Sequence, residues 1–499
     1  MPKVTIEFED RSITAQSENG DTLLSVIQAA GAPLSTPCGG NHQCGKCLVE
    51  VHGAISAPTK EELALLPEGN KRLACFTKVE GPCTIILSNE GNMAIESAYV
   101  SWQGNLEPLY QNGYGAAIDI GTTTVVGQIF CHDAKKPIAV VGERNAQLPY
   151  GADVITRIVH CNEHSVVPLQ KKIKAQLSLL LRRLCGQAGI APEEIRHIVV
   201  TGNTTMLYIL FGLEPKALAY APFIMNTPFG GTFDLGFEYF EAVPVTVPRC
   251  ISAYVGADIT CSVLASGIVH QNKNILLVDA GTNGEMALRT DARIVCCSTA
   301  AGPAFEGAGI ACGGNAVDGA IDSVQYKDGL ISCTTIGGVQ AKSICGSGLI
   351  DAAAALLQSD QMDAKGRLAQ PKVNLCDTDV YIDQRDIRQL QLAKGAIRAG
   401  MDTLLQECRL DYQDIDQIVL CGGFGSFLRP ASAEKIGLIP PACASKSRAI
   451  GNAACNGAGQ ILQSREKWEE SLRIAEQMHT IELSTSPAFS KNFKNAMYF

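Results

Sequence analysis

Short segments in which apolar and polar residues alternate open the chain, and longer apolar runs dominate the rest. Near the start, Val4, Ile6 and Phe8 alternate with polar neighbours, the chain turns at Asp10, and the alternation resumes at Ile13. This pattern predicts a β-hairpin. The chain is therefore expected to begin with two antiparallel strands.

A helix and further strands are predicted after the hairpin. Asp21 precedes a short apolar stripe and Gly31 follows it, which predicts a short helix capped at Asp21 and ended at Gly31. The segments CLVEV at 47–51 and CTIIL at 83–87 predict two more strands.

Three cysteines lie in one glycine-rich loop between these elements. Cys38, Cys44 and Cys47 are close in sequence, and Cys75 follows downstream. Four thiolates suit a structural zinc ion or an iron–sulfur cluster. Zinc sites usually pair two CxxC knuckles, so the three-plus-one spacing favours the cluster, with zinc and a loop without metal as the alternatives. Cys83 is the alternative to Cys75 as fourth ligand.

The loop resembles that of plant-type and adrenodoxin-type [2Fe-2S] ferredoxins. Its first gap has five residues where the plant spacing has four. Gly39, Gly40 and Gly45 would let the backbone curl around a cluster. The resemblance implies a β-grasp fold with metal ligands Cys38, Cys44, Cys47 and Cys75. His42 is expected to face solvent rather than to act as a ligand.

The larger part of the chain contains an internal duplication. The segment 114–130 is an apolar strand ending in Asp119, a Gly-Thr-Thr-Thr turn and a second apolar strand, and 274–288 repeats this design with Asp279 and the turn 281–284. Such turns present backbone N–H groups and hydroxyls to phosphates, and the carboxylates can hold hydrated Mg2+. Two facing hairpins would clamp a nucleotide.

Three further segments complete a recognisable order. The strand at 415–421 runs into a glycine-rich turn, and 254–266 and 450–462 begin helices with small residues suited to close packing. Together the five motifs resemble those of the superfamily of acetate kinase, sugar kinases, heat-shock chaperone ATPases and actin. That resemblance implies a duplicated RNase H-like α/β ATPase. No P-loop and no Rossmann fingerprint after a strand occurs in the sequence.

Composition narrows the classes of function. A net charge of -9 argues against nucleic-acid and anionic-membrane partners. No apolar signal segment or run of membrane-spanning length occurs, so we expect a cytoplasmic protein. Of the 20 cysteines, those outside the cluster set are expected to be buried, reduced side chains.

Five regions are predicted from these patterns: a ferredoxin domain (1–92), a linker long enough to let it move (93–113), the first ATPase half (114–270), the second half with a returning helix (271–465) and a C-terminal extension (466–499).

The combination resembles one family, the reductive activators of corrinoid proteins. The stretches 201–212, 298–314, 343–356, 421–440 and the closing 481–499 also carry this resemblance, although an extra domain that some members have between cluster and ATPase is missing here. The resemblance implies ATP-dependent delivery of an electron from the cluster to a Co(II) corrinoid protein of a methyltransferase system. It also implies an electron donor, and a homodimer is left open.

The resemblance assigns roles to individual residues. Asp119 and Asp279 would serve Mg2+ and its water, and Glu285 and Glu306 are candidates to orient the attacking water or else structural carboxylates. Phosphates would be held by Gly121, Thr122, Thr123, Gly281, Thr282 and Asn283. The nucleoside would be lined by Gly422, Gly423 and Gly425, while Gly302 and Gly307 are nucleotide contacts or simple turns.

Three rival functions stay open on the sequence alone. A small-molecule kinase with a regulatory cluster would need a base over a substrate hydroxyl, and no such residue is identifiable. An activator of another low-potential enzyme usually carries its cluster cysteines within the ATPase fold. An ATP-gated chaperone or redox sensor is the third.

Overall fold

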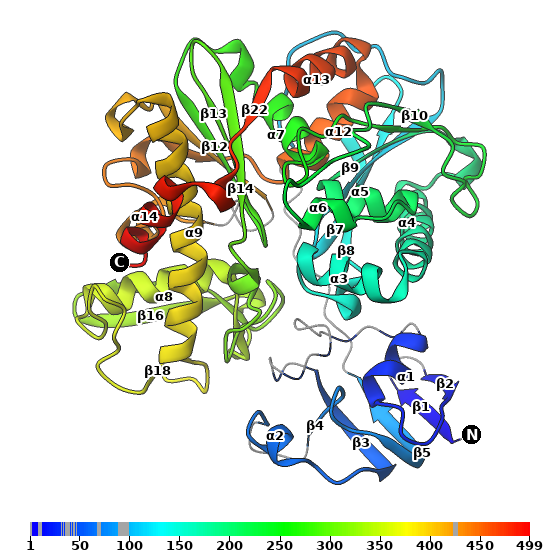
Figure 1. Cartoon of the computed structure of the whole chain (residues 1–499), viewed down its shortest axis with the longest axis vertical. Helices are drawn as coiled ribbons and strands as arrows, with labels where there is room; N and C mark the ends of the chain where they lie inside the picture. Colours follow the sequence, from blue (N-terminus) through cyan, green and yellow to red (C-terminus); the bar gives the residue numbers. More distant parts are fainter. Residues whose placement is uncertain are drawn as a thin grey trace.

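A ferredoxin-like domain and a large two-halved part make up the chain (Figure 1). The computed structural model describes residues 2–499 apart from 8–11, 31, 33, 35–39, 41, 43–44, 46, 67–70, 88–98 and 423–427. Within the described residues, no helix is long and apolar enough to cross a membrane.

The first domain is a mixed sheet with the order β2-β1-β5-β3-β4. Its strands are β1 (Lys3–Glu7), β2 (Ser12–Gln16), β3 (Leu48–Ile55), β4 (Arg72–Leu73) and β5 (Val79–Ile86). The predicted hairpin is confirmed, since β1 and β2 pair antiparallel and Val4 and Ile6 are fully buried. β1 pairs parallel with β5, and the predicted strands at CLVEV and CTIIL correspond to parts of β3 and β5.

Helix α1 (Leu23–Ala29) begins one residue later than predicted. Thr22 is its N-cap, because the Thr22 hydroxyl accepts from the Ser25 N–H at 3.1 Å. The expectation of a capping Asp21 is wrong: its carboxylate accepts instead from the Glu18 N–H in the preceding turn. Gly31 lies outside the described residues. The short α2 (Lys60–Leu63) completes the domain.

The first half of the large part is built on the six-stranded sheet β10-β11-β9-β6-β7-β8. Its strands are β6 (Tyr114–Ile120), β7 (Thr124–Cys131), β8 (Pro137–Arg144), β9 (Ile195–Gly202), β10 (Gly231–Phe233) and β11 (Val245–Val247). Its helices are α3 (Val154–His164), α4 (Val167–Ala188), α5 (Thr204–Phe211) and α6 (Lys216–Ala219). One apolar core joins β6, β7 and β9 to α3, α4 and α5.

The second half repeats this sheet as β21-β20-β12-β13-β14-β22. The strands are β12 (Ile275–Ala280), β13 (Gly284–Arg289), β14 (Ile294–Thr299), β20 (Gln417–Cys421), β21 (Ser447–Ala449) and β22 (Met478–Thr480). In both sheets the first three strands are antiparallel and the next, β9 or β20, is parallel to the first. The duplication seen in the sequence is therefore a duplication of topology.

The second half also carries an added lobe and helical layer (Figure 1). The lobe contains β15 (Ala320–Lys327), β16 (Leu330–Thr335), β17 (Ser343–Ile344), β18 (Lys372–Asn374) and β19 (Tyr381–Asp383). The helices are α8 (Gly346–Gln358), α9 (Gln384–Cys408), α11 (Pro430–Lys435) and α14 (Pro487–Ala496), whereas α13 (Arg465–Gln477) packs against the two helices between the sheets.

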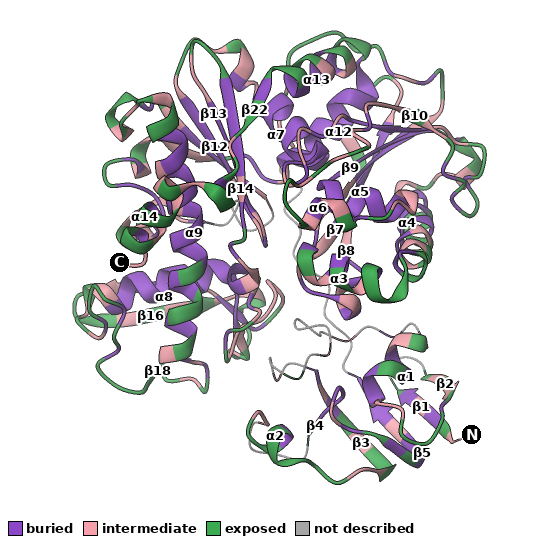
Figure 2. Cartoon of the chain, in the orientation of Figure 1, coloured by how far each residue is buried: buried purple, intermediate pink, exposed green. Residues whose placement is uncertain are grey.

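Two helices from opposite halves lie between the sheets. These are α7 (Ala257–Ser266) and α12 (Ala453–Gln463), which are buried along their whole length (Figure 2). They approach so closely that a Cβ on Gly457 would lie 2.1 Å from the Cys261 carbonyl oxygen. The predicted close packing of small-residue helices is confirmed, and one apolar core contains residues of both sheets and both helices.

Part of the predicted linker is fixed to the large two-halved part of the chain. Leu109 N–H donates to the Leu462 carbonyl at 2.9 Å, and the buried Tyr110 hydroxyl donates to Gln463 at 2.9 Å. Any movement of the first domain must therefore arise from residues before this point. The region boundaries themselves stay predictions.

Candidate functional site

The turns of the two duplicated hairpins line one cavity of about 600 Å³. All eight predicted residues of the two turns line it: Asp119, Gly121, Thr122, Thr123, Asp279, Gly281, Thr282 and Asn283. Glu285, Glu306 and Gly422 line it as well. Residues from distant parts of the chain thus converge on a single space.

The two turns meet each other directly. The hydroxyl oxygens of Thr123 and Thr282 are 3.0 Å apart. In the first turn the Gly121 N–H donates to the Thr124 carbonyl at 2.9 Å, and a Cβ on Gly121 would lie 2.7 Å from that oxygen. A side chain there would disrupt the turn, which explains the glycine.

Glu306 joins the two turns. Its carboxylate accepts from the Thr123 hydroxyl at 2.7 Å and from the Thr282 hydroxyl at 2.8 and 2.9 Å. Burial raises the pKa of Glu306, while the two threonine hydrogen bonds lower it. The Glu306 carboxyl, whether ionised or protonated, therefore lies between the two turns that are expected to hold phosphate groups.

The carboxyls at the strand ends are held in an environment that disfavours their charge. Burial raises the pKa of Asp119 to about 7, against the lowering effect of a hydrogen bond from Asn452 at 3.0 Å. Burial also raises the pKa of Asp279 to about 6, against the lowering effect of a contact with the Cys421 thiol. Such shifts are typical of functional sites.

Two more carboxylates complete this acidic group. Burial raises the pKa of Asp258, at the start of α7, and of Glu285, and each is raised further by neighbouring carboxylates. The buried Glu285 Oε1 has no hydrogen-bond partner among the described residues. A buried acceptor left in this state favours a bound donor or cation.

The acidic group suits a hydrated cation better than one held by protein ligands alone. Among the described residues, no three acidic, histidine or cysteine side chains converge closely enough to hold a metal ion. Mg2+ keeps several waters and is usually shared with substrate phosphates. The residues present therefore fit Mg2+ bound together with a nucleotide.

The predicted glycines fall into three groups. Gly422 lines the cavity with a φ of 87°, and a Cβ there would lie 2.3 Å from Asp279 Oδ1. Gly423 and Gly425 lie outside the described residues. Gly302 and Gly307 flank the short turn that carries Glu306 and do not themselves line the cavity, although both are described.

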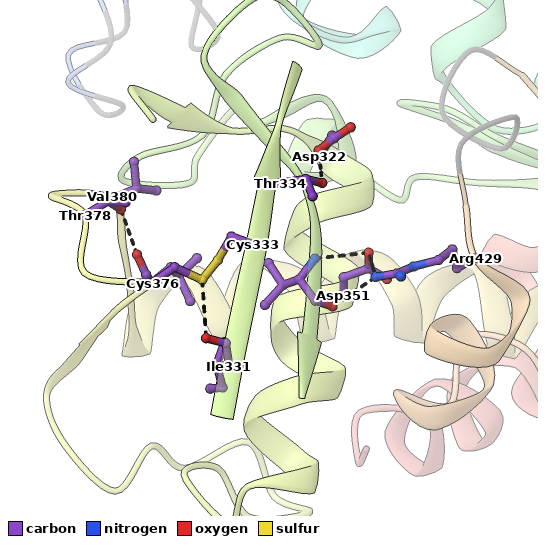
Figure 3. The surroundings of a disulfide bond; sticks show 11 residues. Asp322, Ile331, Cys333, Thr334, Asp351, Cys376, Thr378, Val380 and Arg429 are labelled. Carbon is purple, nitrogen blue, oxygen red and sulfur yellow. Dashed lines mark hydrogen bonds and ion pairs between the residues drawn. A yellow bond between two sulfur atoms is a disulfide. The ribbon is translucent and has the colours of Figure 1, made fainter. Parts of the chain in front are cut away.

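Several cavity residues were not anticipated from the sequence. Asn203 donates to the Thr122 hydroxyl at 3.0 Å, and Asn452 and Asp258 stand at the starts of α12 and α7. The pair Asp351 and Arg429 lines another wall (Figure 3). Only the two helix starts had a sequence signal, because they belong to the connecting segments.

Two of the four predicted cluster ligands are described. The buried Cys47 and Cys75 sulfurs lie 3.3 Å apart, and the Cys75 N–H points to the Cys47 sulfur at 3.4 Å. Cys38 and Cys44 lie outside the described residues. Adjacent thiols with a backbone N–H donor fit iron–sulfur ligation. His42 is exposed, as expected.

One prediction about the remaining cysteines is wrong. Cys333 on β16 and Cys376 form a disulfide (Figure 3), with their Cα atoms 6.0 Å apart. The two are 43 residues apart in sequence, so no spacing rule indicated the pair. The other cysteines outside the cluster set are buried, as predicted, except for Cys131, Cys312 and Cys408, which are partly exposed.

Three family models match consecutive parts of the chain. They are the 2Fe-2S iron-sulfur cluster binding domain (residues 6–80), the RACo middle region (114–271) and the C-terminal domain of RACo, the ASKHA domain (273–499).

Curated relatives and a solved structure agree with these matches. The chain is 32% identical to "Corrinoid activation enzyme RamQ" of Eubacterium limosum, over 77% of this chain and 70% of the relative. It is 26% identical to "[Co(II) methylated amine-specific corrinoid protein] reductase" of Methanosarcina barkeri, over 76% and 75%. The structure of a "Reductive activator for corrinoid,iron-sulfur protein" matches with a TM-score of 0.75 and 27% identity, covering 100% of this chain and 98% of that one.

Proposed function

The chain belongs to the RACo family of reductive activators of corrinoid proteins, and from this premise we propose that it spends ATP to pass an electron from its ferredoxin domain to a Co(II) corrinoid protein. Its activity is the reductive activation of such proteins, which restores the Co(I) state needed for methyl transfer. A separate electron donor reloads the ferredoxin domain.

The ferredoxin domain supplies the redox site. Cys38, Cys44, Cys47 and Cys75 would hold a [2Fe-2S] cluster, which supplies one-electron chemistry when bound. Cys47 and Cys75 are both buried, so the protein limits solvent access on that side, and low solvent exposure is one of the factors that set a cluster's potential.

The cavity supplies the nucleotide site. Backbone N–H groups and hydroxyls of the two turns receive the phosphates, and Asp119 and Asp279 would hold Mg2+ through its water molecules. Glu285 and Glu306 are the proposed carboxylates that orient water near the phosphates, and their position in the cavity lining supports this role.

ATP is required because the electron transfer runs uphill. A protein that binds one state about 10⁴-fold better gains about 5.5 kcal/mol, which corresponds to roughly 240 mV for one electron. ATP-dependent reshaping of the complex with the corrinoid protein supplies a differential of this size.

One observation carries the proposal: two duplicated hairpin turns meet at 3.0 Å around a carboxylate-lined cavity, in the chain whose first domain brings two cysteine ligands together at 3.3 Å. Membership of the RACo family explains why one chain combines an ATPase cavity with a redox domain. The same membership speaks against the kinase and chaperone alternatives.

The test is anaerobic visible spectroscopy of a purified Co(II) corrinoid protein mixed with this protein and a reductant, with and without ATP. We expect the Co(I) band only with ATP. Cys44→Ala should remove cluster absorbance but retain ATP binding, whereas Asp279→Ala should do the converse, and both should abolish Co(I) formation. Absence of Co(I) with several competent corrinoid proteins, despite ATP turnover and an intact cluster, would refute the proposal.

A further inference from the structure

The segment 145–151 is bonded to the first phosphate turn. The buried Asn145 side chain donates to the Gly121 carbonyl at 2.8 Å, and its backbone N–H donates to the Thr123 carbonyl at 2.8 Å. Asn145 is therefore hydrogen-bonded to the turn on both sides of Thr122, so a displacement of the turn would also displace Asn145.

A buried arginine adds a second connection between the same elements. The guanidinium of Arg157, on α3, donates to the Thr122 carbonyl and, at 2.9 Å, to the Gly151 carbonyl. Arg157 is fully buried, and no carboxylate lies within ion-pair distance of it among the described residues. A buried cation is costly unless its donors are satisfied, so Arg157 firmly links the carbonyl of Thr122 in the turn to the carbonyl of Gly151 at the end of the segment.

The middle of the segment contacts the ferredoxin domain. The carbonyl of Pro149 accepts a hydrogen bond from the Gln28 side chain of α1 at 2.6 Å. Pro149 directly follows Leu148, whose N–H donates to the Asn145 carbonyl at 3.0 Å. The phosphate turn and the ferredoxin domain thus bond to one short, internally bonded segment.

Helix α1 is itself bonded to the cluster region. The Leu24 N–H donates to the carbonyl of Ala74, the neighbour of Cys75, at 2.9 Å. A Cβ on Gly40, in the cysteine loop, would lie 3.0 Å from the Leu24 side chain. Gln28 therefore lies on the same helix that is hydrogen-bonded next to Cys75.

We propose that residues 145–151, held by Arg157, couple nucleotide binding at the first phosphate turn to docking of the ferredoxin domain through the Pro149–Gln28 contact. The inference rests on the proposed function in that ATP is the ligand of the turn. Phosphates bound by the turn order it, and the ordered turn fixes the Pro149 carbonyl for Gln28. Coupling between two binding events is reciprocal, so docking strengthens nucleotide binding by the same factor.

The test compares full-length wild type with Gln28→Ala, using a non-hydrolysable ATP analogue with Mg2+. Gln16→Ala is the matched control, because Gln16 is an exposed glutamine of the same domain on β2. Two quantities are measured: the dissociation constant of the analogue, and hydrogen exchange of the α1 amides with and without it.

In wild type and Gln16→Ala, we expect the analogue to increase protection of α1. In Gln28→Ala this increase should be lost, and the analogue should bind about five-fold more weakly, the worth of one net hydrogen bond. An unchanged cluster spectrum would show that the variant is folded.

Two results would overturn the inference, and they are distinguishable. If wild type binds the analogue but Gln28→Ala keeps the same affinity and the same protection, coupling through this contact is refuted while the proposed function stands. If wild type binds no nucleotide, the proposed function fails and the inference fails with it.

Discussion

Replacing Asp119 by Asn should stabilise the nucleotide-free protein at alkaline pH. The carboxyl lies at the end of β6 beside the cavity, and burial raises its pKa from 3.8 to about 7. Asn keeps a side-chain oxygen for the hydrogen bond from Asn452 but carries no charge. The substitution therefore removes the cost of a buried carboxylate with little change of shape.

The size of the effect follows from the pKa. A group whose pKa is higher in the folded state adds stability below its unfolded pKa and loses it as the pH rises through its folded pKa. A pKa of about 7 in place of 3.8 corresponds to about 4 kcal/mol, of which about 3 kcal/mol is lost between pH 5 and pH 8. Water in the cavity still reaches the half-buried carboxyl, so these are upper bounds.

The assay is anaerobic urea unfolding followed by circular dichroism at pH 5 and pH 8, without nucleotide or divalent cation. We expect wild type to lose more stability than Asp119→Asn over this interval. Asp291→Asn, at an exposed position between β13 and β14, is the control and should behave as wild type. Parallel losses in wild type and Asp119→Asn would refute the electrostatic reasoning. The stabilised variant should also bind Mg2+–ATP poorly, because it lacks the carboxylate proposed to hold Mg2+ through water. Such a trade-off between stability and function is common at functional sites.

Three other changes test separate features of the structure. Glu306→Gln should tighten ATP binding about tenfold, because it removes the negative charge of a half-buried carboxylate near the phosphates, and it should slow hydrolysis about a hundredfold. Calorimetry measures the binding and phosphate release measures the rate, and an unchanged rate would exclude a role in hydrolysis. Gly457→Ala should destabilise by about 2 kcal/mol, because its Cβ would lie 2.1 Å from the α7 backbone, whereas Gly186→Ala, with open space around it, should not lower the melting temperature. Cys333→Ser opens a loop of 43 residues and should cost about 4 kcal/mol in the chain-entropy model, seen as faster hydrogen exchange in β16; unchanged exchange would contradict it.

Repeated local patterns were readable from the sequence. The β6–β7 and β12–β13 hairpins were predictable because each joins two apolar strands through an acidic residue and a glycine–hydroxyl turn. The close pairing of α7 and α12 followed from small residues, since only these allow such an approach. The choice of Thr22 over Asp21 as N-cap was not predictable, because both residues suit that position.

Features that depend on distant segments were not predicted. Asp258 lies in a connecting segment that the sequence showed, but it becomes part of the acidic group only when α7 packs beside both sheets. The disulfide and the bonds from Asn145 and Arg157 to the phosphate turn likewise join residues far apart in sequence. Periodicity reports which face of an element is buried, but it does not report which other element covers that face.

The apolar core that α7 and α12 share with both sheets has a practical consequence for dissection of the molecule. A cut near residue 271 would leave α7 on one fragment and α12 on the other, and each fragment would expose an apolar sheet face that the missing helix covers. Exposed apolar faces of this kind promote aggregation. The two halves should therefore be produced together, and separately expressed halves should be insoluble unless they are refolded as a mixture.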